Sequence, residues 1–369
     1  NAVGFQTLVA TKAARICQAA GDRPVLEFGL RRAQGPDGAM AASRAAYVGG
    51  CAGTSNVLAG KTFGIPVKGT QAHSWVMAFE SELDAFKAFA RAAPNNCIFL
   101  VDTYDSLAGT RHAVEAAAEL AGSDNRLLGI RLDSGDLVRL SIEARRILNA
   151  SGHQRATIVG SGDLDERAIE QLDAQGASID VFGVGTRLVT AQDDPALTVV
   201  YKLSAMRGDD GRWEPRVKLS EEAAKSTVPG VLQVRRFSRE WQFMADAVYD
   251  EQIGIECPSR VVDPADPSRS KNMLAHWVGE DLLVPVFDGG EPVGPRRSIE
   301  AARERCRCQL ERLHPVVKRL TDPQPYAVGI EERLHALRMS LATTRMRRGG
   351  DATEETPGQA ERSEETGSR

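Results

Sequence analysis

The chain has 369 residues, a length that at roughly 150 residues per domain predicts two domains and a sizeable core. It carries 46 Lys and Arg against 50 Asp and Glu, so its net charge of −4 argues against a protein that binds nucleic acid through general basicity. Apolar residues make up 42% of the sequence, yet no apolar run approaches the roughly 20 residues of a membrane helix. Six scattered cysteines without a CxxC pair argue against a disulfide framework or a zinc site and favour a cytoplasmic protein.

The first two hundred residues alternate short apolar runs with helical patterns, which is the rhythm of βα units. The chain begins Asn1-Ala2-Val3, without Met or a secretion signal, and residues 3–19 already have the pattern of an amphipathic helix, so we expect an N-terminal segment to be missing. Strands are predicted at 25–30, 65–67, 97–101, 127–132, 156–159, 179–184 and 198–203, and helices at 37–48, 81–93, 106–120, 137–149 and 165–173. Ser81 and Asp84 are a predicted capping pair. These units favour a parallel sheet, which we interpret as a (β/α) barrel rather than a doubly wound sheet.

The pattern changes after residue 201. Gly and Pro at 208–215 predict a hairpin or loop, residues 232–237 and 282–287 resemble strands, and 298–313 is predicted to be a charged surface helix. Residues 349–369 are almost free of apolar side chains and are predicted to be disordered. We therefore expect a barrel core at 1–205, the rest of the barrel with part of a smaller α/β domain at 206–337, and a polar tail at 338–369.

Polar or glycine-rich segments follow the predicted strands, at the end where βα barrels bind their ligands. They are residues 28–32, 69–74, 102–105, 131–136, 160–163 and 183–187. Any one of them is equally well explained as a βα turn, because Asp and Ser cap helices and Gly opens tight turns. Six such segments at one end of a sheet indicate a ligand site instead.

Two of these segments have the composition of a phosphate cradle. Residues 160–163 (Gly-Ser-Gly-Asp) and 183–186 (Gly-Val-Gly-Thr) put small residues ahead of a helix, where backbone N–H groups can approach an anion. Arg31, Arg32 and Arg131 add positive charge suited to phosphate or carboxylate, although surface ion pairs would explain one of the first two equally well.

Carboxylates and one histidine complete the predicted site. Asp133 and Asp136 can hold ribose hydroxyls, coordinate Mg²⁺ or stabilise an oxocarbenium ion, while helix capping is the alternative role for Asp136. His73 stands at a strand end beside a glycine turn, where an imidazole can act as a base or accept a phosphoryl group, although a lone histidine is more often structural. The residues alone therefore indicate a barrel enzyme that acts on a phosphorylated, ribosyl-containing substrate.

Read together, these motifs resemble nicotinate phosphoribosyltransferase. The matching stretches are 27–38, 53–60, 64–74, 102–105, 131–136 and 183–188, and the similarity extends from residue 5 to about residue 337. The resemblance implies an irregular (β/α) barrel of the type II phosphoribosyltransferase kind with part of a smaller α/β domain. It also implies an ATP-dependent ligase of NAD biosynthesis, which joins nicotinate to 5-phosphoribosyl 1-pyrophosphate and releases pyrophosphate. ATP is then a co-substrate, Mg²⁺ accompanies the phosphates, and the enzyme works as a cytoplasmic homodimer with small-molecule substrates only.

The resemblance also assigns roles to individual residues. His73 matches the histidine that is transiently phosphorylated, and Asp133 and Arg131 are the further catalytic residues. By the same resemblance, Phe28 and Arg131 sandwich the pyridine ring, Arg31 meets the nucleotide phosphate and Asp133 holds the ribose. The complete predicted substrate-binding set is Phe28, Arg31, Ser55, Asp102, Ser134, Gly162, Gly183, Gly185 and Thr186.

Ser55 bears on the choice of base. Nicotinamide-using relatives carry an aspartate at this position, which would accept from an amide and repel a carboxylate, whereas a serine can donate to nicotinate. A nicotinamide phosphoribosyltransferase is therefore the nearest alternative. Family members also carry about a hundred residues ahead of the helix that begins this chain, a span of domain size. Another alternative is thus a truncated member that binds phosphoribosyl ligands without turnover, and a third is an unrelated barrel lyase or isomerase.

Overall fold

The computed structural model describes residues 2–120, 126–220, 226–295 and 297–351, and the chain divides into two compact units. The first unit comprises residues 1–199, 295–311 and 319–322, and the second comprises 200–294, 312–318 and 323–369. The first division, after Val199, is close to the predicted boundary at 205, but the predicted segment 206–337 is shared between the units. None of the helices in the described ranges combines the length and apolar character that a membrane span requires.

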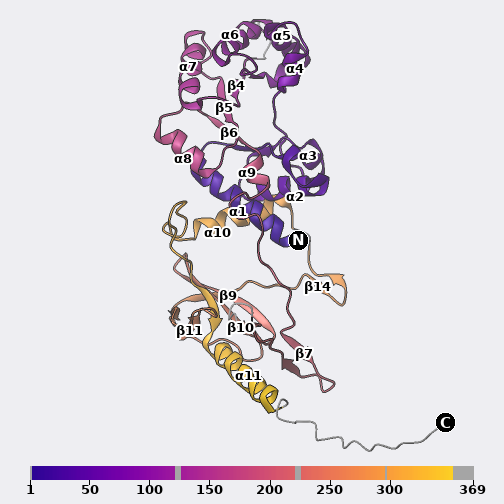
Figure 1. Cartoon of the computed structure of the whole chain (residues 1–369), viewed down its shortest axis with the longest axis vertical. Helices are drawn as coiled ribbons and strands as arrows, with labels where there is room; N and C mark the ends of the chain where they lie inside the picture. The colour runs from indigo at the N-terminus through magenta and orange to yellow at the C-terminus, as the bar shows by residue number, and fades with distance from the viewer. Residues whose placement is uncertain (1, 121–125, 221–225, 296, 352–369) are drawn as a thin grey trace, which may run out of the picture. The chain divides into compact units, whose positions relative to one another are not determined.

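A six-stranded parallel sheet forms the centre of the first unit, in the order β2-β1-β6-β5-β4-β3. Figure 1 labels its strands β4, β5 and β6. Its strands are β1 (Val25–Glu27), β2 (Gly53–Thr54), β3 (Ile98–Leu100), β4 (Gly129–Leu132), β5 (Thr157–Ser161) and β6 (Val181–Val184). Because β2 and β3 are the two edges, the sheet is open and has the form of a half-barrel. The predicted α/β fold with a parallel sheet is confirmed.

Helices α1 to α9 flank these strands and contribute side chains to the buried core, and α10 joins them on the outside. They are α1 (Ala2–Ala20), α2 (Gly35–Val48), α3 (Val57–Phe63), α4 (His73–Met77), α5 (Glu82–Ala92), α6 (Ser106–Ala116), α7 (Leu137–Ala150), α8 (Glu166–Ala174), α9 (Thr186–Val189) and α10 (Ile299–Glu311). The predicted capping pair is confirmed, because Ser81 Oγ accepts a hydrogen bond from Asp84 N at 3.1 Å. Helix α10 packs on α2, and the Arg303 guanidinium donates to the carbonyl oxygens of Tyr47, Gly50 and Cys51, which follow or end α2.

Two of the strands predicted in the first two hundred or so residues were wrong. At 65–67 the chain makes only an isolated bridge between Val67 and Thr54, and the strand at this edge is β2, whose two residues are too few to show a period. Residues 198–203 form no strand in the described chain, and Val199, Val200 and Tyr201 are exposed. Their apolar character therefore does not reflect burial in a sheet.

The second unit is built on a mostly antiparallel sheet in the order β12-β11-β16-β10-β9-β13, with β10 and β16 as its parallel pair. Its strands are β9 (Leu232–Arg239), β10 (Gln242–Asp250), β11 (Ser259–Val262), β12 (Ser270–Met273), β13 (Val278–Asp281) and β16 (Val328–Glu331). The hairpin predicted near 208–215 is formed by β7 (Ala205–Arg207) and β8 (Trp213–Pro215). The strand predicted at 282–287 was wrong, because β13 ends before it and the short hairpin of β14 (Phe287–Asp288) and β15 (Glu291–Pro292) begins at its end.

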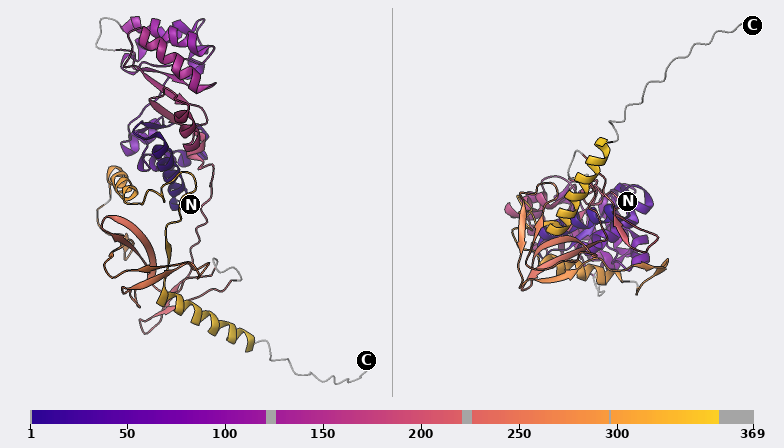
Figure 2. Two further views of the ribbon diagram at one scale, coloured as in Figure 1. Left: turned by 90° about the vertical axis from the view of Figure 1, so that its left-hand side faces the viewer. Right: turned by 90° about the horizontal axis from the view of Figure 1, so that it is seen from below.

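The C-terminal helix α11 (Glu332–Asp351) corrects the predicted tail at 338–369, because residues 338–351 are helical. It directly follows β16 and is drawn in gold in Figure 2. Glu331 Oε2 accepts from the backbone N–H groups of Arg333 and Leu334 at 2.9 and 3.2 Å, and the Leu334 side chain is buried. Capping and one buried leucine thus order a helix that composition alone had assigned to a tail. Residues 352–369 lie outside the described residues.

Candidate active site at the carboxyl ends of the parallel strands

A cavity of about 430 Å³ opens at the carboxyl ends of β1, β4, β5 and β6. Parallel strands bring these ends to one edge of a sheet, which is where α/β proteins bind ligands. Nine of the predicted site residues line it, namely Phe28, Arg31, Arg131, Asp133, Ser134, Gly162, Gly183, Gly185 and Thr186. The volume lies in the range of small-molecule sites, and both guanidinium and carboxylate groups reach it.

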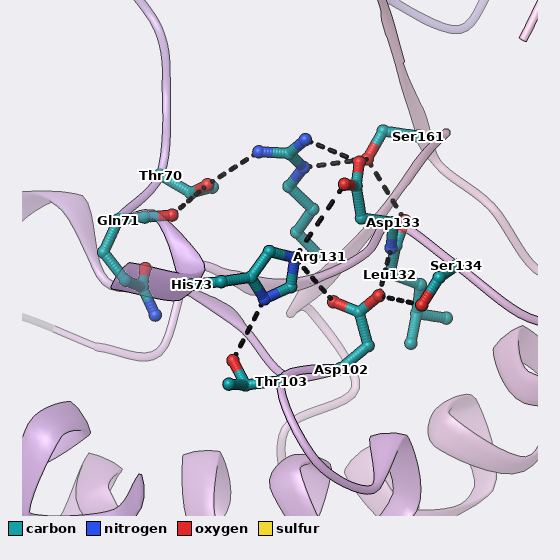
Figure 3. A network of polar contacts seen from close by, with 10 residues as sticks. All are labelled: Thr70, Gln71, His73, Asp102, Thr103, Arg131, Leu132, Asp133, Ser134 and Ser161. Atoms are coloured by element: carbon teal, nitrogen blue, oxygen red, sulfur yellow. Dashed lines mark hydrogen bonds and ion pairs between the residues drawn. The ribbon is translucent and has the colours of Figure 1, made fainter. Parts of the chain in front are cut away.

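An ion pair between Arg131 and Asp133 forms one wall of the cavity (Figure 3). Arg131 Nη2 donates to Asp133 Oδ1 at 2.6 Å, and Ser161 Oγ donates to the same oxygen at 2.5 Å while accepting from Arg131 Nε at 2.8 Å. Burial alone raises the pKa of Asp133, but Arg131, Ser161 and His73 outweigh it and hold that pKa below its usual value. Asp133 is therefore an anion at neutral pH.

Phe28 and Arg131 contact each other across the cavity. The guanidinium carbon of Arg131 lies 4.9 Å from the centroid of the Phe28 ring, a cation–π contact. Gly183 makes room for this ring, because a Cβ at that position would lie 2.5 Å from Phe28 Cε2. A pyridine ring can enter between Phe28 and Arg131 only when the two groups separate.

Groups suited to phosphate line the rest of the cavity. Arg31 and Arg32 belong to the short 3₁₀ helix Leu30–Arg32 and have no ion-pair partner within the described ranges. Gly162 has a φ of 103°, and a Cβ there would overlap the carbonyl oxygen of Asp133, so only glycine allows the chain to turn so closely past β4. This combination of unpaired arginines and close backbone suits an anionic ligand.

His73 begins α4 and lies beside the cavity rather than in its lining. Its Nδ1 is 3.1 Å from Thr103 Oγ1, and its Nε2 is 3.9 Å from both Asp102 Oδ1 and Asp133 Oδ2 (Figure 3). Asp102 is almost completely buried, and its Oδ2 accepts from Asp133 N at 3.1 Å and Ser134 Oγ at 2.5 Å. Its Oδ1 has no hydrogen-bond partner among the described residues. Asp133 therefore connects His73 to the cavity.

Ser55 stands apart from the other predicted residues. It follows β2 and does not line the cavity, and its backbone N–H donates to the carbonyl oxygen of Glu27 at 2.9 Å. Glu27 itself is a buried carboxylate that accepts from Gly29 N, from Ser43 Oγ at 2.8 Å and from Thr54 Oγ1 at 2.5 Å. It fixes the turn from β1 into the Phe28 to Arg32 segment.

Sequence reasoning missed the roles of Ser161, Thr103 and Glu27. Ser161 lies in a segment already identified as a strand end, and Thr103 follows Asp102 directly, so both stood within recognised motifs. The signal for Glu27 is an acidic residue inside an apolar strand, because a buried charge requires several partners. The partners themselves come from distant segments and are visible only in the folded chain.

Comparisons with known proteins agree with this geometry. Residues 24–221 match the Nicotinate phosphoribosyltransferase (NAPRTase) family and residues 233–338 match the Nicotinate phosphoribosyltransferase C-terminal domain. The nicotinate phosphoribosyltransferase of Bacillus subtilis is 42% identical over 90% of this chain and 68% of its own length. That of Dictyostelium discoideum is 38% identical over 90% of this chain and 65% of its own.

Among solved structures, human nicotinic acid phosphoribosyltransferase superimposes with a TM-score of 0.75 at 30% identity, over 92% of this chain and 75% of its own. The chain thus spans about two thirds of the length of the two curated relatives and has the type II phosphoribosyltransferase fold. Both matched regions, the identities and the cavity at the carboxyl ends of the strands lead to one assignment. The chain belongs to the nicotinate phosphoribosyltransferase family.

Proposed function

We propose that this chain forms nicotinate mononucleotide and pyrophosphate from nicotinate and 5-phosphoribosyl 1-pyrophosphate in NAD biosynthesis, coupled to ATP hydrolysis. The observation that carries the proposal is the cavity in which Arg31, Arg131, Asp133 and two glycine-rich turns meet in a chain of this family. In the reaction the C1–O bond to pyrophosphate breaks and the nitrogen of the pyridine ring forms the new bond to C1. Positive charge develops on the ribose, where a nearby carboxylate is stabilising.

The charged groups of the cavity have different roles in this reaction. Asp133, held ionised by Arg131 and Ser161, faces the ribose and stabilises its developing positive charge. Arg31 and the backbone around Gly162, Gly183, Gly185 and Thr186 receive the phosphate groups, with Ser134 and Asp102 at the ribose side. Arg131 swings from its contact with Phe28 to stack on the pyridine ring.

His73 couples ATP to this reaction. A ring nitrogen attacks the γ-phosphorus of ATP, the bond to ADP breaks, and water later cleaves the phosphohistidine to release inorganic phosphate. The side chain is 40% exposed, so ATP can reach it, and Asp133 provides a direct electrostatic connection to the cavity. Phosphorylation adds charge of about −1.5 to −2 beside Asp102 and Asp133, which favours rearrangement of the anion site.

Two carboxylates beside the cavity would hold Mg²⁺ when phosphate groups are bound. Asp102 Oδ1 is buried without a partner in the described chain, and Asp133 Oδ2 faces the same point, so two oxygens suited to Mg²⁺ are present. The described residues contain no group of three His, Cys, Asp or Glu that could hold a metal alone. Asp102 and Asp133 would hold the ion together with phosphate oxygens and water, and Mg²⁺ would supply positive charge against the pyrophosphate.

The proposal also covers the oligomeric state and the cellular compartment. We take the enzyme to be a cytoplasmic homodimer, in keeping with six unpaired cysteines. The exposed apolar side chains of Val284, Val286 and Phe287 in the second unit offer surface that a second copy would bury.

The decisive experiment measures nicotinate mononucleotide from nicotinate, 5-phosphoribosyl 1-pyrophosphate and Mg²⁺, with and without ATP. Wild-type protein is expected to form product faster with ATP and to take up phosphate from γ-labelled ATP. His73→Asn is expected to lose the labelling and the stimulation while retaining slow formation of product. Binding of phosphoribosyl ligands without turnover would identify the chain as an inactive family member instead.

Ser55 tests the choice of base, for which nicotinamide is the second candidate. We expect Ser55→Asp to lower kcat/KM for nicotinate, because a carboxylate at the β2 edge repels the carboxylate of the substrate, and Ser55→Ala to lower it less. An unchanged kcat/KM for nicotinate in Ser55→Asp would refute this role.

A further inference from the structure

The edge of the half-barrel at β3 leads to the segment that carries His73. One edge of β3 pairs with β4. The carbonyl oxygen of Ile98 and the N–H group of Leu100 point toward the other edge, which is open. The chain beyond β2 runs toward this edge, because Val67 bridges Thr54 and Lys68 N donates to Thr54 O at 3.0 Å. After Lys68 no backbone ladder connects the chain to β3 in the described structure. Ile98 O and Leu100 N at this open edge therefore need a hydrogen-bond partner other than a backbone strand.

The side chain of Gln71 is the hydrogen-bond partner of both groups. With its amide in the orientation that satisfies both strand groups, Gln71 donates to Ile98 O at 3.0 Å and accepts from Leu100 N at 2.9 Å. A residue of a parallel strand makes the same two contacts with its backbone, so the Gln71 amide replaces one residue of a missing strand. Gln71 is buried, which makes each of these strand groups costly to leave unpaired.

A second contact joins β3 to the histidine ring. Thr103, three residues after β3, meets His73 Nδ1 at 3.1 Å. The carboxylates of Asp102 and Asp133 flank Nε2, while the Thr103 hydroxyl can donate to or accept from Nδ1 as the tautomer of the ring requires. Gln71 thus fixes the backbone two residues before His73. Thr103 fixes the rotation of the His73 ring (Figure 3).

We propose that Gln71 is a positioning residue for His73, acting with Thr103 as a two-point attachment of the histidine segment to β3. The inference rests on the proposed role of His73 as the phosphoryl acceptor. The attachment holds Nε2 of the His73 ring beside the carboxylates of Asp102 and Asp133. A displacement of about 1 Å at a reacting group costs on the order of 100-fold in rate.

The test compares variants that remove one attachment at a time. Gln71→Met keeps the length but offers neither donor nor acceptor, and Gln71→Glu keeps an acceptor but cannot donate to Ile98 O. Asn96→Ala is the matched control, because Asn96 Nδ2 makes an exposed 3.4 Å contact with Gly69 O in the same segment. Thr103→Val and Thr103→Ser form a second pair, of which only the serine retains the hydroxyl.

Three measurements separate positioning from simple closure of the sheet: amide exchange at Leu100, the ¹⁵N resonances of the His73 ring, and the rate of labelling by γ-labelled ATP. We expect Gln71→Met to accelerate exchange, shift the ring resonances and slow labelling about 100-fold, with Gln71→Glu intermediate and Asn96→Ala unchanged. Thr103→Val is expected to shift the Nδ1 resonance and slow labelling about 10-fold, and Thr103→Ser to retain both.

The proposal is overturned if Gln71→Met, or Gln71→Glu should the former not fold, accelerates Leu100 exchange while ring resonances and labelling stay at wild-type values. Gln71 would then only close the sheet. If wild-type protein shows no labelling at all, the proposed function fails, but the ring resonances still decide whether Gln71 positions His73.

Discussion

An arginine, a phenylalanine, an aspartate and one hydroxyl group come together in both units of the molecule, once in the wall of the cavity and once on a sheet. In the first unit Arg131 lies over Phe28 and binds Asp133, which also accepts from Ser161. In the second unit Arg236 lies 4.6 Å from the Phe243 centroid and binds Asp246, which also accepts from the hydroxyl of Tyr326 at 2.9 Å. Chemical composition alone therefore does not distinguish a site from a structural ion pair.

The two ion pairs differ in how many oxygens of the carboxylate the arginine engages. Arg236 uses Nε and Nη2 on the two oxygens of Asp246, at 2.8 and 2.6 Å, so this carboxylate is engaged on both sides. Arg131 uses Nη2 on Asp133 Oδ1 alone, and Asp133 Oδ2 faces His73 at 3.9 Å. An ion pair with an uncommitted oxygen and an adjacent cavity can act on a ligand, whereas a fully engaged pair stabilises the fold.

The largest effect should come from Arg131→Met. We expect kcat/KM for nicotinate mononucleotide formation to fall by about 10²–10³-fold, because the charge beside the reacting centre is lost. The free energy of unfolding should fall by no more than about 1 kcal/mol, since water in the cavity can solvate Asp133. Steady-state kinetics and urea unfolding measure both, and wild-type kcat/KM in this variant would remove Arg131 from the site.

Arg236→Met is the matched change in the second unit. It leaves the Asp246 side chain, which is only 9% exposed, without its cation, and we expect a loss of about 3 kcal/mol in the free energy of unfolding. At a temperature where the variant is folded, KM for nicotinate should stay near the wild-type value. A strong effect on KM with unchanged stability would contradict the structural role of this pair.

Removing the hydroxyl groups of Ser161 and Tyr326 should give a smaller contrast between the two clusters. Ser161→Ala should lower kcat/KM about 10-fold, since Arg131 and Asp133 lose the group that orients both. Tyr326→Phe should instead cost about 1 kcal/mol of stability and leave kcat/KM unchanged. Equal effects of both variants on activity would show that the two clusters are not functionally distinct.

The smallest contrast is in pH dependence. Burial and the Asp246 carboxylate raise the pKa of Tyr326. The contribution of Tyr326 to stability is therefore complete below about pH 10, where a tyrosine of the unfolded chain titrates. This contribution is lost as the pH rises toward the pKa of Tyr326 in the folded chain. The pKa of Asp133 is lowered, so its contribution is present above about pH 3.9 and is lost as pH falls through the folded pKa. Unfolding curves of Tyr326→Phe and Asp133→Asn against wild type should therefore converge at alkaline and acidic pH respectively. Curves that stay parallel would count against these shifts.

Much of the first unit could be predicted from the sequence, because its strands and helices follow one another in short, regular repeats. The βα rhythm located β1, β3, β4, β5 and β6, and the polar strand ends identified nine residues that line the cavity. The second unit was less predictable, since β16 pairs with β10 and β11, and β13 pairs with β9, across long stretches of sequence. Periodicity describes a single strand, but register and partners depend on tertiary contacts.

The contacts of the site were also beyond sequence reasoning. Nothing in the local sequence indicates that Gln71 replaces a strand residue, that Thr103 meets His73, or that Arg131 lies against Phe28. Each of these contacts joins residues at least 27 positions apart in the chain, and each depends on how closely the backbone packs. The residue types were predictable and their connections were not.

The return of α10 to the first unit has a practical consequence for dissecting this protein. A chain cut after Val199 would keep all six parallel strands but would lose Arg303, whose guanidinium holds the carbonyl oxygens of Gly50 and Cys51 at 2.8 and 2.6 Å. These groups lie just before β2, the strand that leads to Ser55. The unit that carries the cavity is thus discontinuous in sequence, and we expect residues 1–199 co-expressed with residues 295–322 to be more stable than residues 1–199 alone.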